Sequence, residues 1–215
     1  MHPSPMKEKP IRSISKIKRH FQKVDPVIFS AMQGMELELL EIECSPAGYF
    51  PKLCREIISQ QLAGKAAHAI VGRFAALFPR EKITPERVLA IPEEGLRAIG
   101  MSWAKARYVR NLAEKTLAGE IEFKKFPAMG EEEVIAELTK VSGIGRWTAE
   151  MFLMFTLGRE DVFSYGDLGL LKGFAQLYGK RKAKIQKSME AVVRRWSPYK
   201  SYASLTLWQV KDFQA

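Results

Sequence analysis

Two glycines in the second half of the chain have the spacing of a phosphate-binding turn. Gly143 and Gly145 flank Ile144 in the stretch VSGIGRWTA, and the residues on both sides have the apolar spacing of helices. Glycine adopts positive φ without a steric penalty, so it suits a sharp turn between helices. Because the second helix begins directly after the turn, its first amides and the positive end of its dipole would face outwards. The pattern predicts an anion site; an ordinary tight corner is the alternative.

The segments around this turn read as helices throughout. Between residues 50 and 78 apolar side chains recur every four positions, and Gly64 is expected to divide this run into two helices. Thr84 followed by Pro85 is typical of a helix start. Further helices are predicted over 102–117, 131–138 and 148–157, and no segment reads as a strand. The sequence therefore predicts an all-α protein of about ten helices.

The composition limits the partners and the environment. The 215 residues carry a net charge of +10, which favours a polyanionic partner but does not separate nucleic acid from an acidic protein or a membrane surface. Cys44 and Cys54 are the only cysteines, too few and too far apart for a zinc or iron–sulfur site, and they fit a reducing cytoplasm. No apolar run approaches the roughly 20 residues of a membrane span. We expect a soluble, cytoplasmic protein.

Four segments, in the same order, resemble the helix-hairpin-helix DNA glycosylase superfamily, over roughly residue 50 to the C-terminus. The hairpin and the acidic stretch after it are carried by VSGIGRWTAEMFLMFTLGREDVFSYGDLGL. The other three segments are IISQQLAGKAAHAIVGRF, GMSWAKARYVRNLA and RRWSPYKSYASLTLW. The resemblance implies a two-lobed all-α fold with the active cleft between the lobes. We expect a central lobe over 48–158 and a second lobe from 1–47 plus 159–215.

One position of the hairpin indicates the branch of this superfamily. Glycosylases that also cut the strand carry Lys two residues after the second hairpin glycine, where this chain has Trp147. The chain thus resembles the monofunctional DNA-3-methyladenine glycosylase II branch, called AlkA-type, with no iron–sulfur cluster and no cofactor for catalysis. The resemblance implies a monomer that flips alkylated purines, chiefly 3-methyladenine, out of double-stranded DNA and excises them, leaving an abasic site. Two alternatives are a glycosylase for hypoxanthine or ethenoadenine, and a non-catalytic DNA-binding protein.

The resemblance also assigns the reacting groups. Of the two acids after the hairpin, Asp161 and Asp167, the second matches the catalytic aspartate of the family, which begins a helix. A carboxylate there would stabilise the positive charge that develops on the sugar and would orient or deprotonate the attacking water. A plain helix N-cap is the structural alternative for Asp167. Asp161 is expected to hold the preceding loop.

The resemblance implies a base pocket, a DNA-binding surface and an ion site. An alkylated purine is positively charged, so it would stack on an indole with a cation–π gain of roughly 0.5 to 2 kcal/mol. Each tryptophan of the pocket could instead belong to the core, and the glutamines before Leu62 could simply cap helices. Gln61 aligns with the residue that fills the gap left by the flipped base. The residues expected to bind the base are Trp147, Trp196, Met151 and Leu168. The residues expected to bind DNA are Gln60, Gln61, Leu62, Gly143, Gly145 and Thr148. The resemblance also implies a structural Na⁺ or K⁺ held by the main-chain carbonyls of Thr139, Val141 and Ile144.

Overall fold

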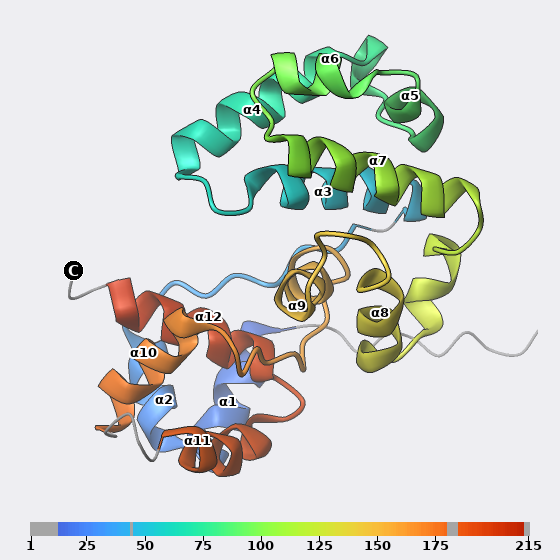
Figure 1. Cartoon of the computed structure of the whole chain (residues 1–215). Helices are drawn as coiled ribbons and strands as arrows, with labels where there is room; N and C mark the ends of the chain where they lie inside the picture. Colours follow the sequence, from blue (N-terminus) through green and yellow to red (C-terminus); the bar gives the residue numbers. More distant parts are fainter. Residues whose placement is uncertain (1–12, 44, 180–184, 213–215) are drawn as a thin grey trace, which may run out of the picture. The chain divides into compact units, whose positions relative to one another are not determined.

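The structure is a computed structural model that describes residues 13–43, 45–179 and 185–212. Within these ranges every regular element is a helix (Figure 1), which confirms the all-α class predicted from the sequence. Cys44 lies outside the described residues. The elements are α1 (Ile14–Val24), α2 (Pro26–Gln33), α3 (Pro46–Ser59), α4 (Gly64–Ala76), η1 (Pro79–Glu81), α5 (Pro85–Leu89), α6 (Glu93–Ala98), α7 (Trp103–Leu117), η2 (Phe123–Ala128), α8 (Glu131–Leu138), α9 (Arg146–Phe155), α10 (Leu168–Tyr178), α11 (Ile185–Val193), η4 (Arg194–Trp196) and α12 (Lys200–Asp212).

The chain divides into two compact units. Unit 1 consists of Met1–Leu40 and Tyr165–Ala215, and unit 2 is Glu41–Ser164. Unit 2 contains the whole of the segment expected as the central lobe, 48–158. Both ends of the chain therefore belong to one unit, and the hairpin belongs to the other.

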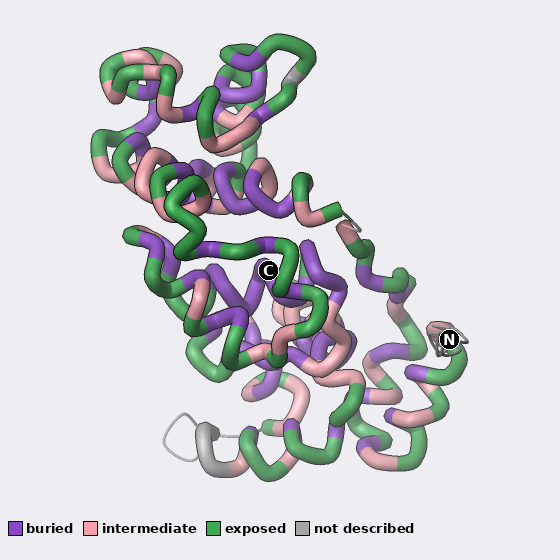
Figure 2. The backbone as a smooth tube through the Cα atoms, turned by 90° about the vertical axis from the view of Figure 1, so that its right-hand side faces the viewer, coloured by how far each residue is buried: buried purple, intermediate pink, exposed green. Residues whose placement is uncertain are grey.

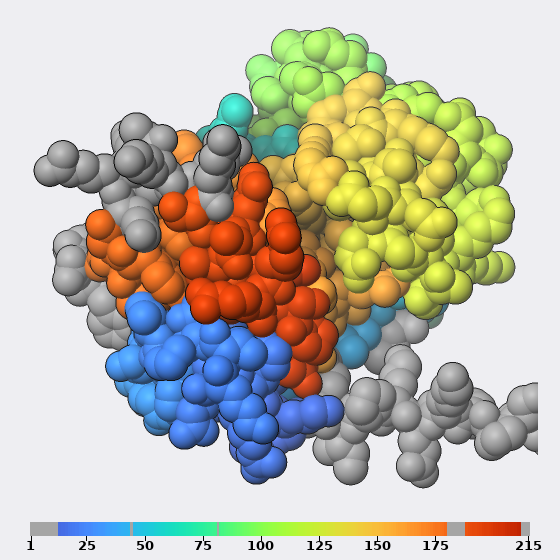
Figure 3. All heavy atoms as spheres, turned by 90° about the horizontal axis from the view of Figure 1, so that it is seen from below, coloured from blue at the N-terminus to red at the C-terminus, as the bar shows by residue number. Residues whose placement is uncertain are grey.

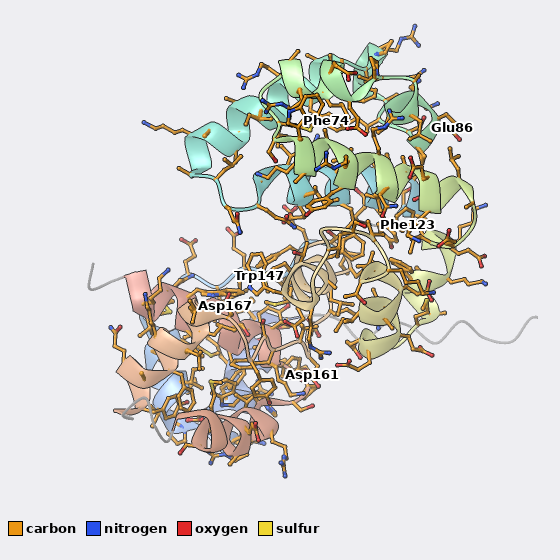
Figure 4. The ribbon with its side chains drawn as sticks, in the orientation of Figure 1. Phe74, Glu86, Phe123, Trp147, Asp161 and Asp167 are labelled. Carbon is orange, nitrogen blue, oxygen red and sulfur yellow. The ribbon has the colours of Figure 1, made fainter. Side chains whose placement is uncertain are left out.

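Unit 2 is built around α7, which packs against α3, α5 and α6. Helix α3 also packs against α4 and η2, and α8 packs against α9. Buried and exposed residues alternate along most of these helices (Figure 2), so each of those buries one apolar face, whereas α9 is buried on all sides from Thr148 to Met154. An aromatic cluster joins α3 to η2 and α9, with Tyr49 stacked on Phe126 at a centroid distance of 6.4 Å. Phe123 (Figure 4) and Phe152 meet the Tyr49 ring edge-on.

The helix starts in unit 2 follow the capping residues of the sequence. The Thr84 hydroxyl accepts a hydrogen bond from the Arg87 amide, and α5 begins at Pro85. Ser102 caps α7 in the same way through the Lys105 amide. Helix α4 begins at Gly64, which confirms that this glycine divides the 50–78 run. Local sequence signals thus place the elements that support the hairpin.

Unit 1 is held together by the packing of α10 against α12, while α2 packs against both. A Cβ on Gly173 would overlap the backbone of Leu207, so glycine is needed where α10 crosses α12. Atoms of the N-terminal helices lie directly against those of α12 (Figure 3). Among the described residues, no helix combines the length and apolar character needed to span a membrane.

Candidate active site and nucleic-acid interface

The hairpin joins α8 to α9 through residues 139–145. Gly143 has φ +83°, and a Cβ there would overlap the ring of Tyr108 on α7, so glycine is required for two reasons. Gly145 has φ −90° and caps α9, and a Cβ on it would meet only open space. The positive φ expected for this pair is therefore found at Gly143 alone. The bare Gly145 leaves the N-terminus of α9 open to an approaching phosphate.

One face of α7 supports both the hairpin and the loop after α3. Lys105, Tyr108 and Asn111 are spaced by three residues and lie on that face. The Asn111 side-chain oxygen accepts a hydrogen bond of 3.0 Å from the Ser142 amide. The Lys105 ammonium donates to the carbonyls of Ile58 at 2.8 Å and Gln60 at 2.6 Å. Partial burial lowers the pKa of this ammonium.

The loop Gln60-Gln61-Leu62 leaves the end of α3 and contacts the hairpin. The Gln60 side-chain amide donates to the Gly143 carbonyl at 2.9 Å and to the Thr148 hydroxyl at 3.3 Å. Both donors of this amide group are thus engaged with the protein, and they tie the loop to the hairpin. Gln61 is exposed and has φ +55°, a strained conformation for a residue other than glycine. Leu62 is also exposed. The structure therefore leaves Gln61 and Leu62 as the projecting residues of this loop.

A pocket of about 440 Å³ opens between this loop and the start of α9. Trp147, labelled in Figure 4, lines this pocket, and 46% of its surface is exposed. An exposed indole beside a loop with two projecting side chains is suited to stack on a flat aromatic ring.

Sequence reasoning missed Glu56, which also lines the pocket. Its signal was that it is the single acid of α3 and stands one helical turn before Gln60. The pocket is lined by Glu56, Ser59, Gln60, Gln61, Leu62, Trp147 and Thr148.

Asp167 lies at the N-terminus of α10 in unit 1 (Figure 4). Its Oδ1 accepts hydrogen bonds from the Leu170 amide at 2.8 Å and from the Trp208 indole nitrogen at 3.0 Å. Asp167 therefore caps α10, as the structural alternative predicted. The Trp208 indole holds the same oxygen, and a plain N-cap does not need this second bond. Asp161 is half-buried in a turn of unit 2 after α9.

The position of Trp196 argues against the base-binding role expected for it. Trp196 is fully buried in unit 1, and its indole nitrogen donates to Oδ2 of Asp25 at 2.9 Å. The Tyr178 hydroxyl donates to the same oxygen at 2.8 Å, and Oδ1 of Asp25 caps α2. The indole therefore completes a buried polar network in the core of unit 1 and offers no surface on which a base could stack.

The remaining expected pocket residues have opposite environments. Met151 follows Trp147 by one turn of α9 but is buried. Leu168, the first residue of α10, is 71% exposed. Thr148, which was expected to bind DNA, is buried, accepts the Gln60 hydrogen bond and lines the same pocket as Trp147. Of the four residues expected to bind a base, Trp147 alone lines the unit 2 pocket.

The expected ion site uses main-chain carbonyls, and oxygen donors of this kind suit a hard monovalent cation. The Val141 carbonyl accepts a hydrogen bond of 3.0 Å from the Ile144 amide. A carbonyl has two lone pairs, so this bond leaves one for an ion. Within the described residues, no cluster of His, Cys, Asp and Glu side chains is suited to a metal ion.

Known proteins resemble this chain in sequence and in fold. DNA-3-methyladenine glycosylase 1 of Schizosaccharomyces pombe is 36% identical over 164 residues, which cover 74% of this chain and 71% of that protein. The crystal structure of DNA-3-methyladenine glycosidase from Bacillus halodurans has a TM-score of 0.80 and 34% identity, covering 95% of this chain and 90% of that one. The S. pombe 3-methyladenine DNA glycosylase Mag1 in complex with abasic DNA has a TM-score of 0.75 and 30% identity, covering 90% and 95%. Residues 54–198 match the HhH-GPD family, and the chain thus belongs to the HhH-GPD superfamily of base excision DNA repair proteins.

Proposed function

We propose that this chain is a monofunctional DNA glycosylase that flips alkylated purines, chiefly 3-methyladenine, out of duplex DNA and leaves an abasic site. Membership of the HhH-GPD superfamily makes it a DNA glycosylase of base excision repair, a hydrolase of N-glycosidic bonds. The observation that carries the finer proposal is Trp147. Its indole is exposed in a pocket on the hairpin helix, and it stands where strand-cleaving glycosylases carry a lysine.

In this proposal the hairpin binds the DNA backbone, and the loop Gln60-Gln61-Leu62 occupies the place of the flipped base. The open N-terminus of α9 binds a phosphate next to the damaged nucleotide. Gln61 and Leu62 fill the space that the extruded base leaves in the stack. A cation held by the carbonyls of Thr139, Val141 and Ile144 would add positive charge beside that phosphate. The flipped purine then stacks on the indole of Trp147.

The reaction is hydrolysis at C1′ of the damaged nucleotide. As the bond from C1′ to N9 breaks, its electron pair leaves with the base and positive charge develops on the sugar. We assign the carboxylate of Asp167 to stabilise that charge and to accept a proton from the attacking water. A base that already carries a methyl group and a positive charge leaves as a neutral molecule. Alkylated purines are therefore good leaving groups without further protonation.

The proposal is tested by identifying the bases that the protein releases. Duplex DNA treated with a methylating agent is incubated with the protein, and the free bases are separated by chromatography. We expect 3-methyladenine to be released, and no covalent adduct with DNA to be trapped by borohydride. Absence of any free base would contradict the enzymatic proposal, and a trapped adduct would contradict its monofunctional part.

A further inference from the structure

The pocket that contains Trp147 also contains a carboxyl group that the proposed reaction does not use. Glu56 is on the last full turn of α3, four residues before Gln60, and it lines the pocket together with Trp147 and Thr148. Its side chain is half-buried. Within the described part of the chain, the Glu56 carboxyl makes no hydrogen bond and no ion pair. A half-buried carboxyl group with no protein partner is available to a ligand that enters the pocket.

The surroundings of Glu56 favour its neutral form. Residues before and after it on α3, Cys54, Ile57 and Ile58, are buried in the core of unit 2. Burial raises the pKa of the Glu56 carboxyl, and the charge of Lys52 on the same helix partly offsets this effect. A neutral carboxylic acid is a hydrogen-bond and proton donor, whereas a carboxylate only accepts. A protonated carboxyl group that lines the same pocket as the exposed indole of Trp147 has the chemistry of a general acid.

We propose that Glu56 is a general acid that protonates neutral damaged purines, such as hypoxanthine or ethenoadenine, when they stack on Trp147. The inference rests on the proposed glycosylase function and assigns a further catalytic residue to it. The Glu56 O–H bond breaks and its proton forms a bond to a ring nitrogen of the base. The bond from C1′ to N9 breaks with its electrons moving to N9, so the base leaves uncharged. Water oxygen bonds to C1′, and Asp167 accepts the water proton. Glu56 ends as a carboxylate and Asp167 as a carboxylic acid, so the net charge of the protein is unchanged.

The two classes of substrate separate this role from a general contribution to the pocket. A cationic base such as 7-methylguanine leaves as a neutral molecule, so it requires no proton from Glu56. A neutral base would leave as an anion unless it is protonated. General acid catalysis contributes typically about 10²- to 10⁴-fold in rate. The effect of removing the acid should therefore appear in the ratio of the two excision rates.

The test uses duplexes that carry a single 7-methylguanine or a single hypoxanthine, under single-turnover conditions. In Glu56→Gln the ratio of the hypoxanthine rate to the 7-methylguanine rate is expected to fall by about 10²-fold or more. Glu56→Asp, which keeps an acid, should recover part of that ratio. Glu94→Gln is the matched control, since Glu94 is an exposed acid of α6 in the same unit. Thermal unfolding of each variant by circular dichroism checks the fold.

Each outcome has a definite reading. An unchanged ratio in Glu56→Gln, or an equal fall of both rates, would overturn the general-acid role. A parent protein that releases 7-methylguanine but neither hypoxanthine nor ethenoadenine would also overturn it, while leaving the proposed function intact. A parent that releases no base at all would overturn the proposed function itself. If Glu56→Gln does not fold, the ratio measured for Glu56→Asp decides, because a shorter acid should lower the hypoxanthine rate selectively.

Discussion

The indole nitrogen of Trp208 donates a hydrogen bond of 3.0 Å to Oδ1 of Asp167, the oxygen that also caps α10 through the Leu170 amide. The carboxyl group is therefore held from two directions, by a helix N-terminus and by a side chain of α12. An ordinary N-cap needs only the first of these bonds. The second bond fixes the rotation of the carboxyl group, which is what an acid that must face a reacting atom requires.

Replacing Asp167 separates its capping role from a catalytic role. Asn is about as good an N-cap as Asp, so Asp167→Asn should lower the free energy of unfolding by less than about 1 kcal/mol. An amide cannot accept the water proton, so base release from methylated DNA should fall by at least about 10²-fold. Chromatography of released bases and thermal unfolding measure the two effects. Asp161→Asn is the control, and equal rates for both variants and the parent would remove Asp167 from the reaction.

The helices of this chain could be predicted from local signals, because their caps are local. Thr84 with Pro85 and Ser102 each mark a helix start in the sequence and in the structure. Helix α9 begins at Arg146, two residues before the start expected at Thr148. The N-cap of α9 is Gly145, which has no side chain to accept a hydrogen bond, so no capping residue marks the start in the sequence. The start expected from the apolar residues alone was therefore too late.

The candidate site was harder to predict, because it depends on contacts between distant segments. Trp196 meets Asp25, and 171 positions separate them in sequence, so nothing near Trp196 marks it as a core residue. Glu56 and Trp147 line the same pocket although 91 positions separate them in sequence, and the Gln60 bond to the Gly143 carbonyl joins the two segments that carry them. Motif resemblance found the residues of the hairpin, whereas the lone acid on α3 belongs to no motif and was missed.

Trp147 is expected to matter for the substrate and little for the fold. Because its side chain is about half exposed, Trp147→Ala should change the free energy of unfolding only modestly. Loss of stacking on a cationic base, roughly 0.5 to 2 kcal/mol, should weaken excision of 7-methylguanine by about 2- to 30-fold. Trp103→Ala is a matched control, since that indole is 45% exposed and lies outside the pocket. Equal losses in both variants would contradict a base contact at Trp147.

The two hairpin glycines should respond differently to alanine. Gly143→Ala places a methyl group on the Tyr108 ring at a positive φ, so it should destabilise the protein by about 2 kcal/mol or more. Gly145→Ala meets open space at negative φ and should cost less than about 1 kcal/mol. The methyl group would nevertheless stand where a phosphate approaches, so DNA affinity should fall. Chemical denaturation and fluorescence anisotropy with a labelled duplex measure these effects. Equal unfolding free energies for the two variants would contradict this account.

Lys105 is expected to position the loop Gln60-Gln61-Leu62, which we propose to fill the DNA stack. In Lys105→Met the carbonyls of Ile58 and Gln60 lose their donor, which should cost about 1 to 3 kcal/mol in stability. A less ordered loop should also flip the target base less well. The fluorescence of 2-aminopurine placed beside the lesion, which rises when the neighbouring base unstacks, reports this step. Lys124→Met, at an exposed position of η2, is the control. An unchanged fluorescence rise in Lys105→Met would show that the ammonium has no part in flipping.

The rate of hypoxanthine excision should depend on pH through Glu56. Burial raises the pKa of this carboxyl above its ordinary value, and the charged group that acts on it is Lys52 of α3. The nearby cation of α7, Lys105, is bound to the carbonyls of Ile58 and Gln60. Because the acid must be protonated to donate, the rate should fall as the pH rises through its pKa.

The same measurement on Glu56→Gln identifies the group that titrates. An amide has no proton to lose in this range, so the alkaline decline of the hypoxanthine rate should disappear in the variant while the slower residual rate stays level. Glu56→Gln keeps Asp167, so any pH dependence that remains in the variant does not come from Glu56. The pH profile of the variant therefore distinguishes the two acids. A decline at the same pH in parent and variant would assign the titration to another group and remove Glu56 as the proton donor.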